Sequence, residues 1–480
     1  MLFLRPRNDT LLIGDYAAMK SSIDASASRR EFIKTTGKLA AVSALANVAI
    51  PAVHAAGSDL IQVALIGCGG RGGGAAANAL SVKRGPVKLV AMADIFPVRL
   101  QKDLTKLQTQ FASQVDVPPD RQFIGFDAFQ KAMDCLKPGD IAIFATPPAF
   151  RWVHFSYAIQ KGLNVFMEKP LTVDGPTSKR MFKLGQEAQA KNLKVGVGLM
   201  SRHNRAMQEL AKRVHDGEIG EIILQRGYRM HGPGGYFSSL PKPAGITDLL
   251  YQVQRFHSFI WASGGCFNDF YIHLIDQLGW MKNQWPVKAQ ALGGRHYRTN
   301  PEGIMYVDQN FDTYSVEYTY SDGAKFFFDG RTISGCEQIY SSYLQGTKGS
   351  GIASKAGDCG QPSSLYASQD LTSKIFWESK VNPEEQDPYQ NEWNDLIDAI
   401  RDDKPYNEVQ RGVEASLVSS MGRMAAHTGR EVTYDQMLNS DFEMSPNTDK
   451  FTMDYPAPLV ADADGRYPVP QPGIVTSREY

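Results

Sequence analysis

The stretch Leu60–Gly72, with the sequence LIQVALIGCGGRG, decides the fold of this chain of 480 residues. Its first half is a nearly continuous apolar run rich in β-branched residues, which is typical of a strand buried on both faces. The glycines that follow have the spacing GxGxxG, and the Ala-rich segment from Gly74 to Leu80 then predicts a helix. The first glycine allows a tight turn, the second lets the backbone approach a pyrophosphate, and the third lets helix and strand pack closely. The stretch therefore predicts a dinucleotide-binding turn at a helix N-terminus.

A second apolar run, from Val87 to Ala93, ends in Asp94 about 20 residues after the glycine turn. A carboxylate at this place accepts hydrogen bonds from the adenosine ribose hydroxyls and repels a 2′-phosphate, so NAD is favoured over NADP. The alternative interpretation of Asp94 is a helix N-cap or a turn residue. Arg71 either contacts a phosphate or stays solvated on the loop, and the sequence favours neither interpretation.

The alternation of strands and helices continues beyond Asp94. Residues 140–147, with the sequence DIAIFATP, predict a strand whose C-terminal end meets the cofactor, where open parallel sheets hold their ligands. A helix is expected from Phe155 to Lys161, and Asn164–Met167 predicts the next strand. This spacing predicts an α/β domain with a doubly wound parallel sheet.

The strand at Asn164–Met167 ends in Glu168-Lys169-Pro170, and with this motif the chain resembles the Gfo/Idh/MocA family of oxidoreductases. The family includes glucose–fructose oxidoreductase and inositol dehydrogenase, and its members join a Rossmann domain to a C-terminal α+β domain. Further matching elements run through nearly the whole chain after residue 55: Ala145-Thr146-Pro147, His154, Gly196-Val197-Gly198 with Arg202, Asp216-Gly217-Glu218-Ile219-Gly220, Gly264-Gly265 before Asp269 and His273, and Gly346-Thr347-Lys348-Gly349.

The resemblance implies an NAD(P)-dependent oxidoreductase that acts by hydride transfer on a CH–OH group of a sugar, a sugar derivative or a glycoside. It implies a Rossmann domain at 58–172 and an α+β substrate and oligomerisation domain at 173–443 with a large, mostly antiparallel open sheet. The residues that it assigns to the cofactor are Gly67, Gly69, Gly70, Arg71, Gly72, Asp94, Thr146, Pro147, His154, Glu168 and Lys169.

Oxidation of an alcohol requires a base for the hydroxyl proton while the hydride leaves the carbon. Lys169 follows a strand end that faces the cofactor, and an ammonium partly removed from water beside a nicotinamide cation should have a lowered pKa. Asp269 and His273 are four residues apart and share one face if their segment is helical. In the family the lysine, the aspartate and the histidine surround the reacting hydroxyl. Carried over, His273 accepts or relays the proton, Asp269 is its partner or a substrate ligand, and Lys169 is the orienting acid or base.

These residues also have structural interpretations. Lys169 can form an ion pair with Glu168, and His273 can be a buried histidine bonded to a backbone carbonyl. His273 and Asp276 are weak candidates for a metal site because no third ligand stands at a fixed spacing, so no metal is predicted. The family often has glycine where this chain has Tyr271, and the further candidate contacts to substrate are Arg202, Trp261, Tyr271 and Asp276.

Strict alternation from Asp312 to Tyr320 predicts a strand with one aromatic and one polar face, followed by a hairpin turn and a strand at Lys325–Phe328. Ile222–Tyr228 and Val287–Leu292 are expected to join the same sheet. The resemblance implies that one face of this sheet packs on helices and that the other forms the interface of a homo-oligomer. The tyrosines expected on that interface are Tyr314, Tyr318 and Tyr320.

Residues 229–262 form a long Gly- and Pro-rich excursion that contains Arg255, His257 and Trp261. Excursions of this length are typically lids or binding elements. The Pro-, Asp- and Tyr-rich tail at 444–480 is expected to wrap over the surface or to reach a neighbouring subunit.

The first 55 residues resemble a twin-arginine export signal. Ser28–Lys34 has the sequence SRREFIK, an apolar Ala-rich stretch follows, and Val53-His54-Ala55 is a small-x-small cleavage site. The alternative is an amphipathic first helix, which Pro51 disfavours. Export predicts a periplasmic or other extracytoplasmic location. It also predicts a tightly bound cofactor, because little free dinucleotide is available outside the cytoplasm.

Composition and charge exclude several classes of protein. The 51 Lys and Arg residues balance 51 Asp and Glu residues, so the basic surface of a nucleic-acid binder is not expected. No run of about 18 apolar residues predicts a membrane span. The five cysteines form no CxxC pair, which excludes a zinc ribbon. Two other functions stay open: a redox-neutral glycosidase that oxidises a sugar hydroxyl transiently, and a carbohydrate-binding protein that has lost turnover.

Overall fold

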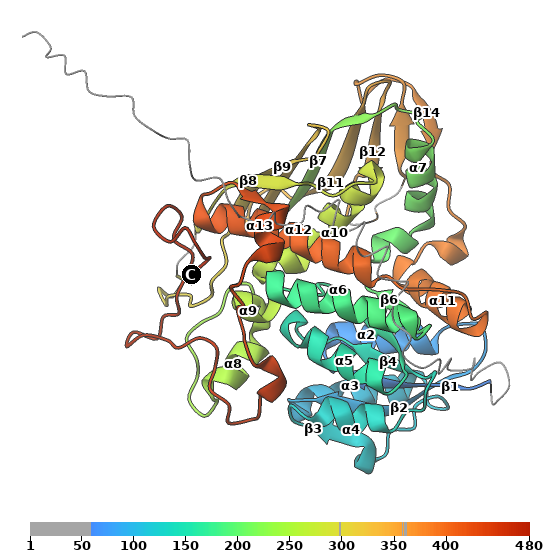
Figure 1. The fold of residues 1–480 in the computed structure, drawn as a ribbon, viewed down its shortest axis with the longest axis vertical. Coiled ribbons are helices and arrows are strands. Elements are labelled where there is room, and N and C mark those ends of the chain that lie inside the picture. Colours follow the sequence, from blue (N-terminus) through green and yellow to red (C-terminus); the bar gives the residue numbers. More distant parts are fainter. Residues whose placement is uncertain (1–58, 297–298, 358, 360–361) are drawn as a thin grey trace, which may run out of the picture. The chain divides into compact units, whose positions relative to one another are not determined.

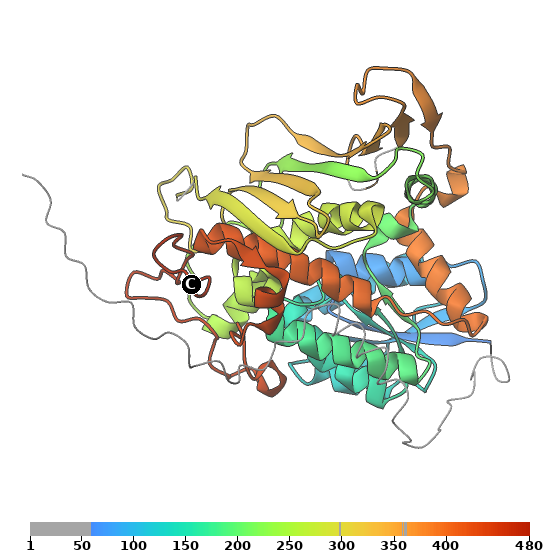
Figure 2. The same cartoon turned by 45° about the horizontal axis from the view of Figure 1, so that its top comes forward.

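Two β-sheets and the helices around them make up the described part of the chain (Figure 1, Figure 2). The computed structural model describes residues 59–296, 299–357, 359 and 362–480. The export signal predicted at 1–55 lies outside these residues. Among the helices that the structure describes, none is both long and apolar enough to cross a bilayer.

The six strands of sheet A are parallel and lie in the order β3-β2-β1-β4-β5-β6, which confirms the predicted doubly wound sheet. From β1 the chain leads outward to β2 and β3, and it then crosses to β4 on the other side of β1. The glycine turn at 67–70 follows β1 at this switch point, where open parallel sheets bind their ligands. The strands are β1 (Ile61–Ile66), β2 (Val87–Asp94), β3 (Gln122–Ile124), β4 (Ile141–Phe144), β5 (Asn164–Met167) and β6 (Val195–Val197).

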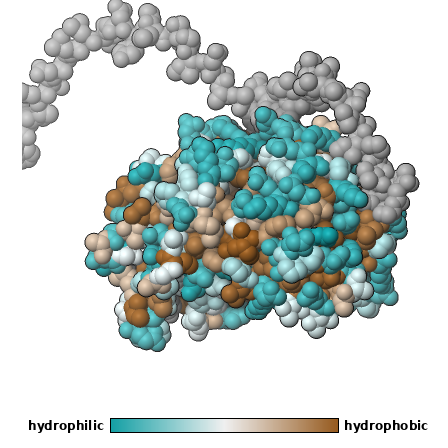
Figure 3. Space-filling model, turned by 90° about the horizontal axis from the view of Figure 1, so that it is seen from below, coloured by the Kyte–Doolittle hydropathy of each residue, from teal (hydrophilic) through white to brown (hydrophobic). Residues whose placement is uncertain are grey.

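Helix α2 begins at Gly70, four residues before the start predicted at Gly74. Glycine is a poor helix former, so the sequence pattern placed the start of the helix at the last glycine of the run. Viewed from below, hydrophilic residues cover much of the face and hydrophobic residues form separate patches between them (Figure 3). The helices of this half are α2 (Gly70–Leu80), α3 (Pro97–Gln110), α4 (Ala128–Asp134), α5 (Arg151–Gln160) and α6 (Gly175–Ala190).

Sheet B has nine strands in the order β14-β13-β12-β11-β7-β10-β9-β8-β15. Among these described strands, β7 and β10 pair in parallel and the other neighbours pair antiparallel, as predicted for a mostly antiparallel sheet. The strands are β7 (Ile222–His231), β8 (Lys288–Gly294), β9 (Thr313–Thr319), β10 (Lys325–Thr332), β11 (Ile339–Gly346), β12 (Ser350–Ser354), β13 (Ser364–Tyr366), β14 (Ile375–Glu378) and β15 (Val432–Thr433).

The parallel pair requires a long crossover from β7 to β10, because parallel neighbours cannot be joined by a hairpin. This crossover contains the excursion after β7, in which α8 (Asp248–Gln254) and α9 (Ile260–Ser263) lie, and then α10 (Gly265–Lys282), β8 and β9. Helix α10 carries Asp269 and His273 and lies against sheet B beside α12 (Val409–Thr428) (Figure 1). The remaining helices are α7 (Arg205–His215), α11 (Pro388–Arg401) and α13 (Tyr434–Asn439).

The aromatic face of β9 is buried, so the prediction that its tyrosines line a subunit interface is wrong. Tyr314, Tyr318 and Tyr320 are 3%, 0% and 1% exposed. Tyr318 donates to the carbonyl of Val418 on α12, and Tyr314 Oη lies 2.9 Å from His427 Nε2 on the same helix. Alternation shows which residues share a face of a strand. Which face the helices cover depends on contacts with segments far away in the sequence, and alternation does not reveal it.

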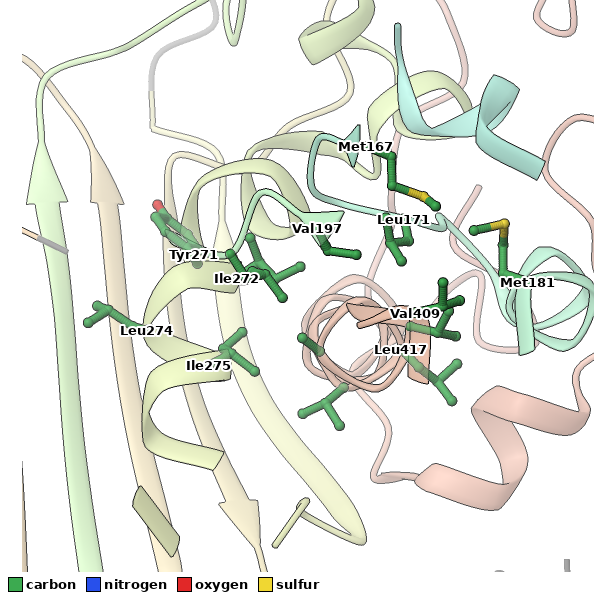
Figure 4. Close-up of a cluster of buried hydrophobic side chains, with 14 of the residues drawn as sticks. Met167, Leu171, Met181, Val197, Tyr271, Ile272, Leu274, Ile275, Val409 and Leu417 are labelled. Carbon is green, nitrogen blue, oxygen red and sulfur yellow. The ribbon is translucent and has the colours of Figure 1, made fainter. Parts of the chain in front are cut away.

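One apolar core runs from sheet A through α10 and α12 to sheet B (Figure 4). Met167 and Leu171 come from the end of β5, Val409 and Leu417 from α12, and Ile272 from α10. All five side chains are buried. This shared core fixes α10 against the carboxyl end of β5 and therefore sets Asp269 close to Lys169.

The tail at 444–480 packs on the excursion between β7 and α10. Phe451 and Tyr467 lie against Trp261 and Phe259, with ring centroids 6.1 and 4.9 Å apart. The side-chain amide of Gln252 donates to the carbonyl of Leu459 at 2.8 Å. The tail therefore covers the excursion from outside, in line with the expectation that it wraps over the surface.

Candidate active site

The glycine turn leaves an open place at the N-terminus of α2. A Cβ atom at Gly67 would lie 2.7 Å from the carbonyl carbon of Ala145, and one at Gly72 would lie 2.0 Å from the carbonyl oxygen of Gly67. Gly67 also has a φ of +97°, which L side chains rarely adopt. At Gly69 and Gly70, by contrast, an added Cβ meets no atom within 4 Å. The chain itself requires glycine at 67 and 72, and the space at 69 and 70 faces a cavity.

This cavity has a volume of about 570 Å³, within the usual range for cofactor sites. It extends from the glycine turn to the residues that follow β5 and to the excursion after β7. Twelve of the predicted site residues line it: Gly67, Gly69, Gly70, Arg71, Gly72, Asp94, Thr146, Pro147, His154, Glu168, Lys169 and Asp269.

Asp94 is fixed at one end of the cavity by two backbone groups. Its Oδ2 accepts from the N–H of Cys68 at 2.6 Å, and its Oδ1 accepts from the N–H of Phe96 at 2.8 Å. Burial raises the pKa of Asp94, although both hydrogen bonds act in the opposite direction. The carboxylate thus lies where the glycine fingerprint predicts a residue that binds the ribose. Each of its oxygens has a further lone pair that can accept a hydrogen bond from a hydroxyl.

His154 lines the middle of the cavity as a neutral imidazole. Burial, together with the charge of Arg151, lowers the pKa of His154 to about 3. Its Nδ1 lies 3.2 Å from Thr146 Oγ1. The glycine cradle, the fixed carboxylate and this neutral lining fit a bound dinucleotide, with its pyrophosphate over Gly69 and Gly70.

Glu168 and Arg71 form an ion pair beside the glycine turn, with Arg71 Nε 2.9 Å from Glu168 Oε1. The Arg71 guanidinium also lies over the ring of Tyr389, 4.6 Å from its centroid. Arg71 is therefore not free on the loop, and it would have to break its contact with Glu168 or Tyr389 to bind a phosphate. Glu168 takes Arg71 as its partner, while Lys169 pairs with Asp269.

Lys169 and Asp269 meet at the other end of the cavity. Lys169 Nζ donates to the backbone carbonyl of Asp269 at 2.6 Å and lies 3.6 Å from its Oδ1. His257 Nε2 lies 3.2 Å from Asp269 Oδ2. Burial raises the pKa of Asp269, but Lys169 and His257 outweigh it and hold this pKa well below its usual value. Asp269 therefore stays ionised and acts as an anchor for cations rather than as a proton donor.

His273 lies one turn beyond Asp269 on α10, 6% exposed. Its Nδ1 has no hydrogen-bond partner among the described residues. Burial holds the pKa of His273 well below its ordinary value, and the charges of Lys169 and Arg229 lower it further. His273 does not itself line the cavity, but it is a neutral imidazole with an unused nitrogen within electrostatic reach of Lys169.

The four further substrate candidates do not line the cavity. Arg202 and Asp276 bind each other, with contacts of 2.7 to 3.0 Å, and Asp276 is fully buried. Tyr271 packs on Phe328 of sheet B, and Trp261 donates from its Nε1 to Gln252. In this structure each of these side chains has an internal partner, which sequence spacing alone did not show, and their contact with substrate stays a prediction.

His257 is one of the cavity residues to which the sequence assigned no catalytic or binding role. It stands in the excursion, 12 positions before Asp269, and no local spacing relates the two residues. The available signal was a histidine among aromatic residues in a long excursion just ahead of the Asp269 segment. Among the described residues, no group of three or more His, Cys, Asp or Glu side chains could hold a metal ion.

Comparisons with known proteins agree with this geometry. Residues 61–199 match the Gfo/Idh/MocA model, described as an oxidoreductase family with an NAD-binding Rossmann fold. An inositol 2-dehydrogenase of Corynebacterium glutamicum is 30% identical over 142 residues, which are 29% of this chain and 40% of the relative. An inositol 2-dehydrogenase of Rhizobium meliloti is 24% identical over 231 residues, 48% of this chain and 58% of the relative. The chain thus spans about two fifths to three fifths of these relatives.

Two solved structures share the fold over 78% of this chain and 99% of their own. One is a myo-inositol 2-dehydrogenase from Lactobacillus plantarum, 21% identical, with a TM-score of 0.56. The other is a levoglucosan dehydrogenase in complex with NADH and levoglucosan, 18% identical, with a TM-score of 0.58. At these identities the likeness is one of fold. Residues 61–199 are similar to the NAD-binding Rossmann domain of the Gfo/Idh/MocA oxidoreductase family.

Proposed function

We propose that this protein is an NAD-dependent oxidoreductase that removes a hydride from a CH–OH group of an inositol, a sugar or a sugar derivative. The observation that carries the proposal is a single cavity with the glycine turn and Asp94 at one end and Lys169 and Asp269 at the other. A dinucleotide held over Gly69 and Gly70 has room to extend toward Lys169. The inositol 2-dehydrogenases among the relatives support the substrate class.

Bound NAD⁺ supplies the acceptor for the hydride. The N-terminus of α2 binds the pyrophosphate, and Asp94 accepts from the ribose hydroxyls. Asp269 stays ionised and directs the ammonium of Lys169 into the cavity, where Lys169 hydrogen-bonds the reacting hydroxyl oxygen. Lys169 passes one of its protons to the neutral imidazole of His273, which does not line the cavity, and takes up the hydroxyl proton in its place. Excursion residues, including Tyr236, Val253 and Phe256, line the cavity and exclude water from the Lys169 end.

Three finer properties belong to the proposal. Asp94 favours NAD over NADP, because a second negative charge beside this buried carboxylate is unfavourable. The export motif at 28–34 supports an extracytoplasmic enzyme with a tightly bound cofactor. The face of sheet B that carries Leu292 and Phe327, 78% and 40% exposed, supports a subunit interface there.

The test begins with the purified full chain. We expect its absorbance spectrum to reveal bound nucleotide, and mass spectrometry of the released nucleotide to identify NAD. Incubation with myo-inositol, glucose, levoglucosan and aryl glycosides should then give net NADH with at least one polyol or sugar. Parallel reactions with NADP should be slower.

Three other outcomes of these assays would identify a different function or contradict the proposal. Release of the aglycone without net NADH would identify the redox-neutral glycosidase. Sugar binding without either reaction would identify a binding protein, and a chain that takes up neither NAD nor NADP would contradict the proposal.

Gly72→Ala is expected to weaken NAD binding about 10- to 100-fold, because a Cβ at this position meets the carbonyl of Gly67 and pushes α2 away from β1, an overpacking that costs about 1–3 kcal/mol. Calorimetric titration with NAD measures the loss. Gly294→Ala on β8 is the control, since its added Cβ meets no atom within 4 Å and Gly294 does not line the cavity. Equal affinities for the two variants would show that the turn does not bind the nucleotide.

A further inference from the structure

We propose that His257 is a positioning residue for the reaction centre, which holds the carboxylate of Asp269 and through it the amine of Lys169. The inference rests on the proposed function and adds a residue supplied by the excursion after β7. It depends on four observations: the imidazole lines the cavity, each of its two nitrogens has a partner, the surrounding residues immobilise the ring, and Asp269 lies between His257 and Lys169.

The imidazole has a defined partner on each nitrogen. Nε2 lies 3.2 Å from Asp269 Oδ2, and Nδ1 accepts a hydrogen bond from the backbone N–H of Tyr236 at 3.3 Å. An N–H group can only donate, so Nδ1 carries no proton and the neutral ring has its proton on Nε2. This tautomer donates to the carboxylate of Asp269.

The surrounding residues immobilise the ring. The backbone carbonyl of His257 accepts from the side-chain amide of Asn310 at 2.9 Å. The rings of Phe256 and Phe237 lie 3.8 and 5.4 Å from the imidazole, centroid to centroid. The imidazole side chain is only 15% exposed. It is therefore held in place before any substrate enters, as precise positioning requires.

Hydrogen bonds to two other parts of the fold hold the excursion, and they therefore help to fix the position of His257. Arg99 of α3 donates to the carbonyl of Gln254 at 3.1 Å, close to the adenosine end of the cavity. Leu459 of the tail accepts from the side chain of Gln252. The excursion thus spans the cavity from the Asp94 end to the Asp269 end.

The carboxylate of Asp269 lies between Lys169 and His257, which come from different segments of the chain. Lys169, which follows β5, lies 3.6 Å from Oδ1, and His257 approaches Oδ2. The other charged groups that act on this carboxylate include His273 on its own helix. Without His257, a carboxylate that is only 11% exposed would lose its partner at Oδ2 and would turn toward Lys169. The amine would then be drawn out of the line in which it meets the substrate hydroxyl.

The prediction for turnover follows directly. His257→Ala should lower kcat about 10- to 100-fold, the effect of a misplacement of about 1 Å at a reacting centre. The affinity for NAD should stay within about twofold of wild type, because the nucleotide contacts do not involve His257. His257→Gln should restore much of kcat, since its amide can reach the place of Nε2 and donate to Asp269. His215→Gln, a histidine on α7 that bonds Trp280 and does not line the cavity, is the control.

A double-mutant cycle with Asp269→Asn separates positioning from direct contact. If His257 acts through Asp269, the double variant should lose no more kcat than Asp269→Asn alone. Losses that multiply would show that His257 acts on the substrate independently and would overturn the inference. A fall in NAD affinity with unchanged kcat would overturn it as well, because it would mark a merely structural role.

A readout without turnover keeps the two proposals apart. In the protein without added substrate, selective ¹⁵N labelling of histidine should show one ring with a protonated Nε2 and an unprotonated Nδ1 that is lost in His257→Ala. Asp269→Asn should shift this signal. A wild-type protein that forms no NADH with any sugar would overturn the proposed function. A His257 signal that stays unchanged in Asp269→Asn would overturn the pairing of His257 with Asp269.

Discussion

Lys169→Met should lower kcat by about 10²- to 10⁴-fold, the usual contribution of a positioned acid or base, and should leave NAD bound. Methionine keeps the length and the apolar stem of lysine but cannot donate or accept a proton. Lys169 Nζ lies in the cavity next to Asp269, beyond the residues that form the glycine cradle. The chemistry and the nucleotide contacts are therefore separable. Steady-state kinetics with the best substrate, together with titration of NAD, measure the two effects.

The matched control is Lys161→Met, which removes a lysine that pairs with Asp134 at the protein surface. Its kcat should stay within about twofold of wild type. A Lys169→Met variant with wild-type kcat would show that proton transfer does not depend on this amine. In that case His273, with its unpaired Nδ1, would remain as the acid–base group.

Glu479→Ala should lower the free energy of unfolding by about 3–5 kcal/mol, the cost of leaving a buried charge without its partner. Glu479 is 2% exposed and accepts from Arg423 Nε and Nη2 at 2.9 and 2.8 Å. Arg423 is fully buried and also donates to the carbonyl of Gly264 and to Asn268, just before Asp269. Glu479 thus completes a buried ion cluster that contacts the residue next to Asp269 in the chain. Urea unfolding at neutral pH measures the loss.

The same ion pair predicts a pH dependence. Burial raises the pKa of Glu479, but Arg423 and His427 together bring this pKa down to about 2, below its ordinary value of 4.5. A lowered carboxyl pKa stabilises the folded state fully above about pH 4.5, and this contribution is lost as the pH falls toward 2. The difference in stability between wild type and Glu479→Ala should therefore be smaller at pH 3 than at pH 7.

Glu384→Ala is the control for both measurements, because Glu384 forms an exposed pair with Lys83. Exposed pairs contribute about 0–1 kcal/mol, so little change is expected. An equally small effect of Glu479→Ala would show that Arg423 finds other partners when the carboxylate is removed.

The Rossmann half could be predicted from the sequence because its signals are local. The strand at 61–66, the glycines that follow it and Asp94 lie within 40 residues or so, and each type of residue is required by a contact nearby. The cavity residues followed from the same logic, since the carboxyl ends of parallel strands converge. The resemblance added Asp269, which the structure brings to Lys169.

The parts that the sequence did not reveal depend on contacts between distant segments. Arg202 and Asp276 are 74 positions apart, and their pairing explains why neither lines the cavity. The inward direction of Tyr318 depends on α12, which lies a hundred positions later. His257 meets Asp269 only because the excursion folds back over the cavity. No periodicity or spacing within a segment contains this information.

The crossover from β7 to β10 places the two ends of the cavity in separate stretches of chain. Sheet A and its turns supply the nucleotide end, while the crossover contributes His257 and Asp269 to the other end. The excursion lies between two strands of sheet B and is not itself part of the sheet, so its cavity-lining side chains can vary separately from the glycine turn. Changes at Tyr236 or Val253, which line the cavity but belong neither to the glycine turn nor to the Lys169–Asp269 pair, should therefore alter which substrate fits while the nucleotide end stays the same.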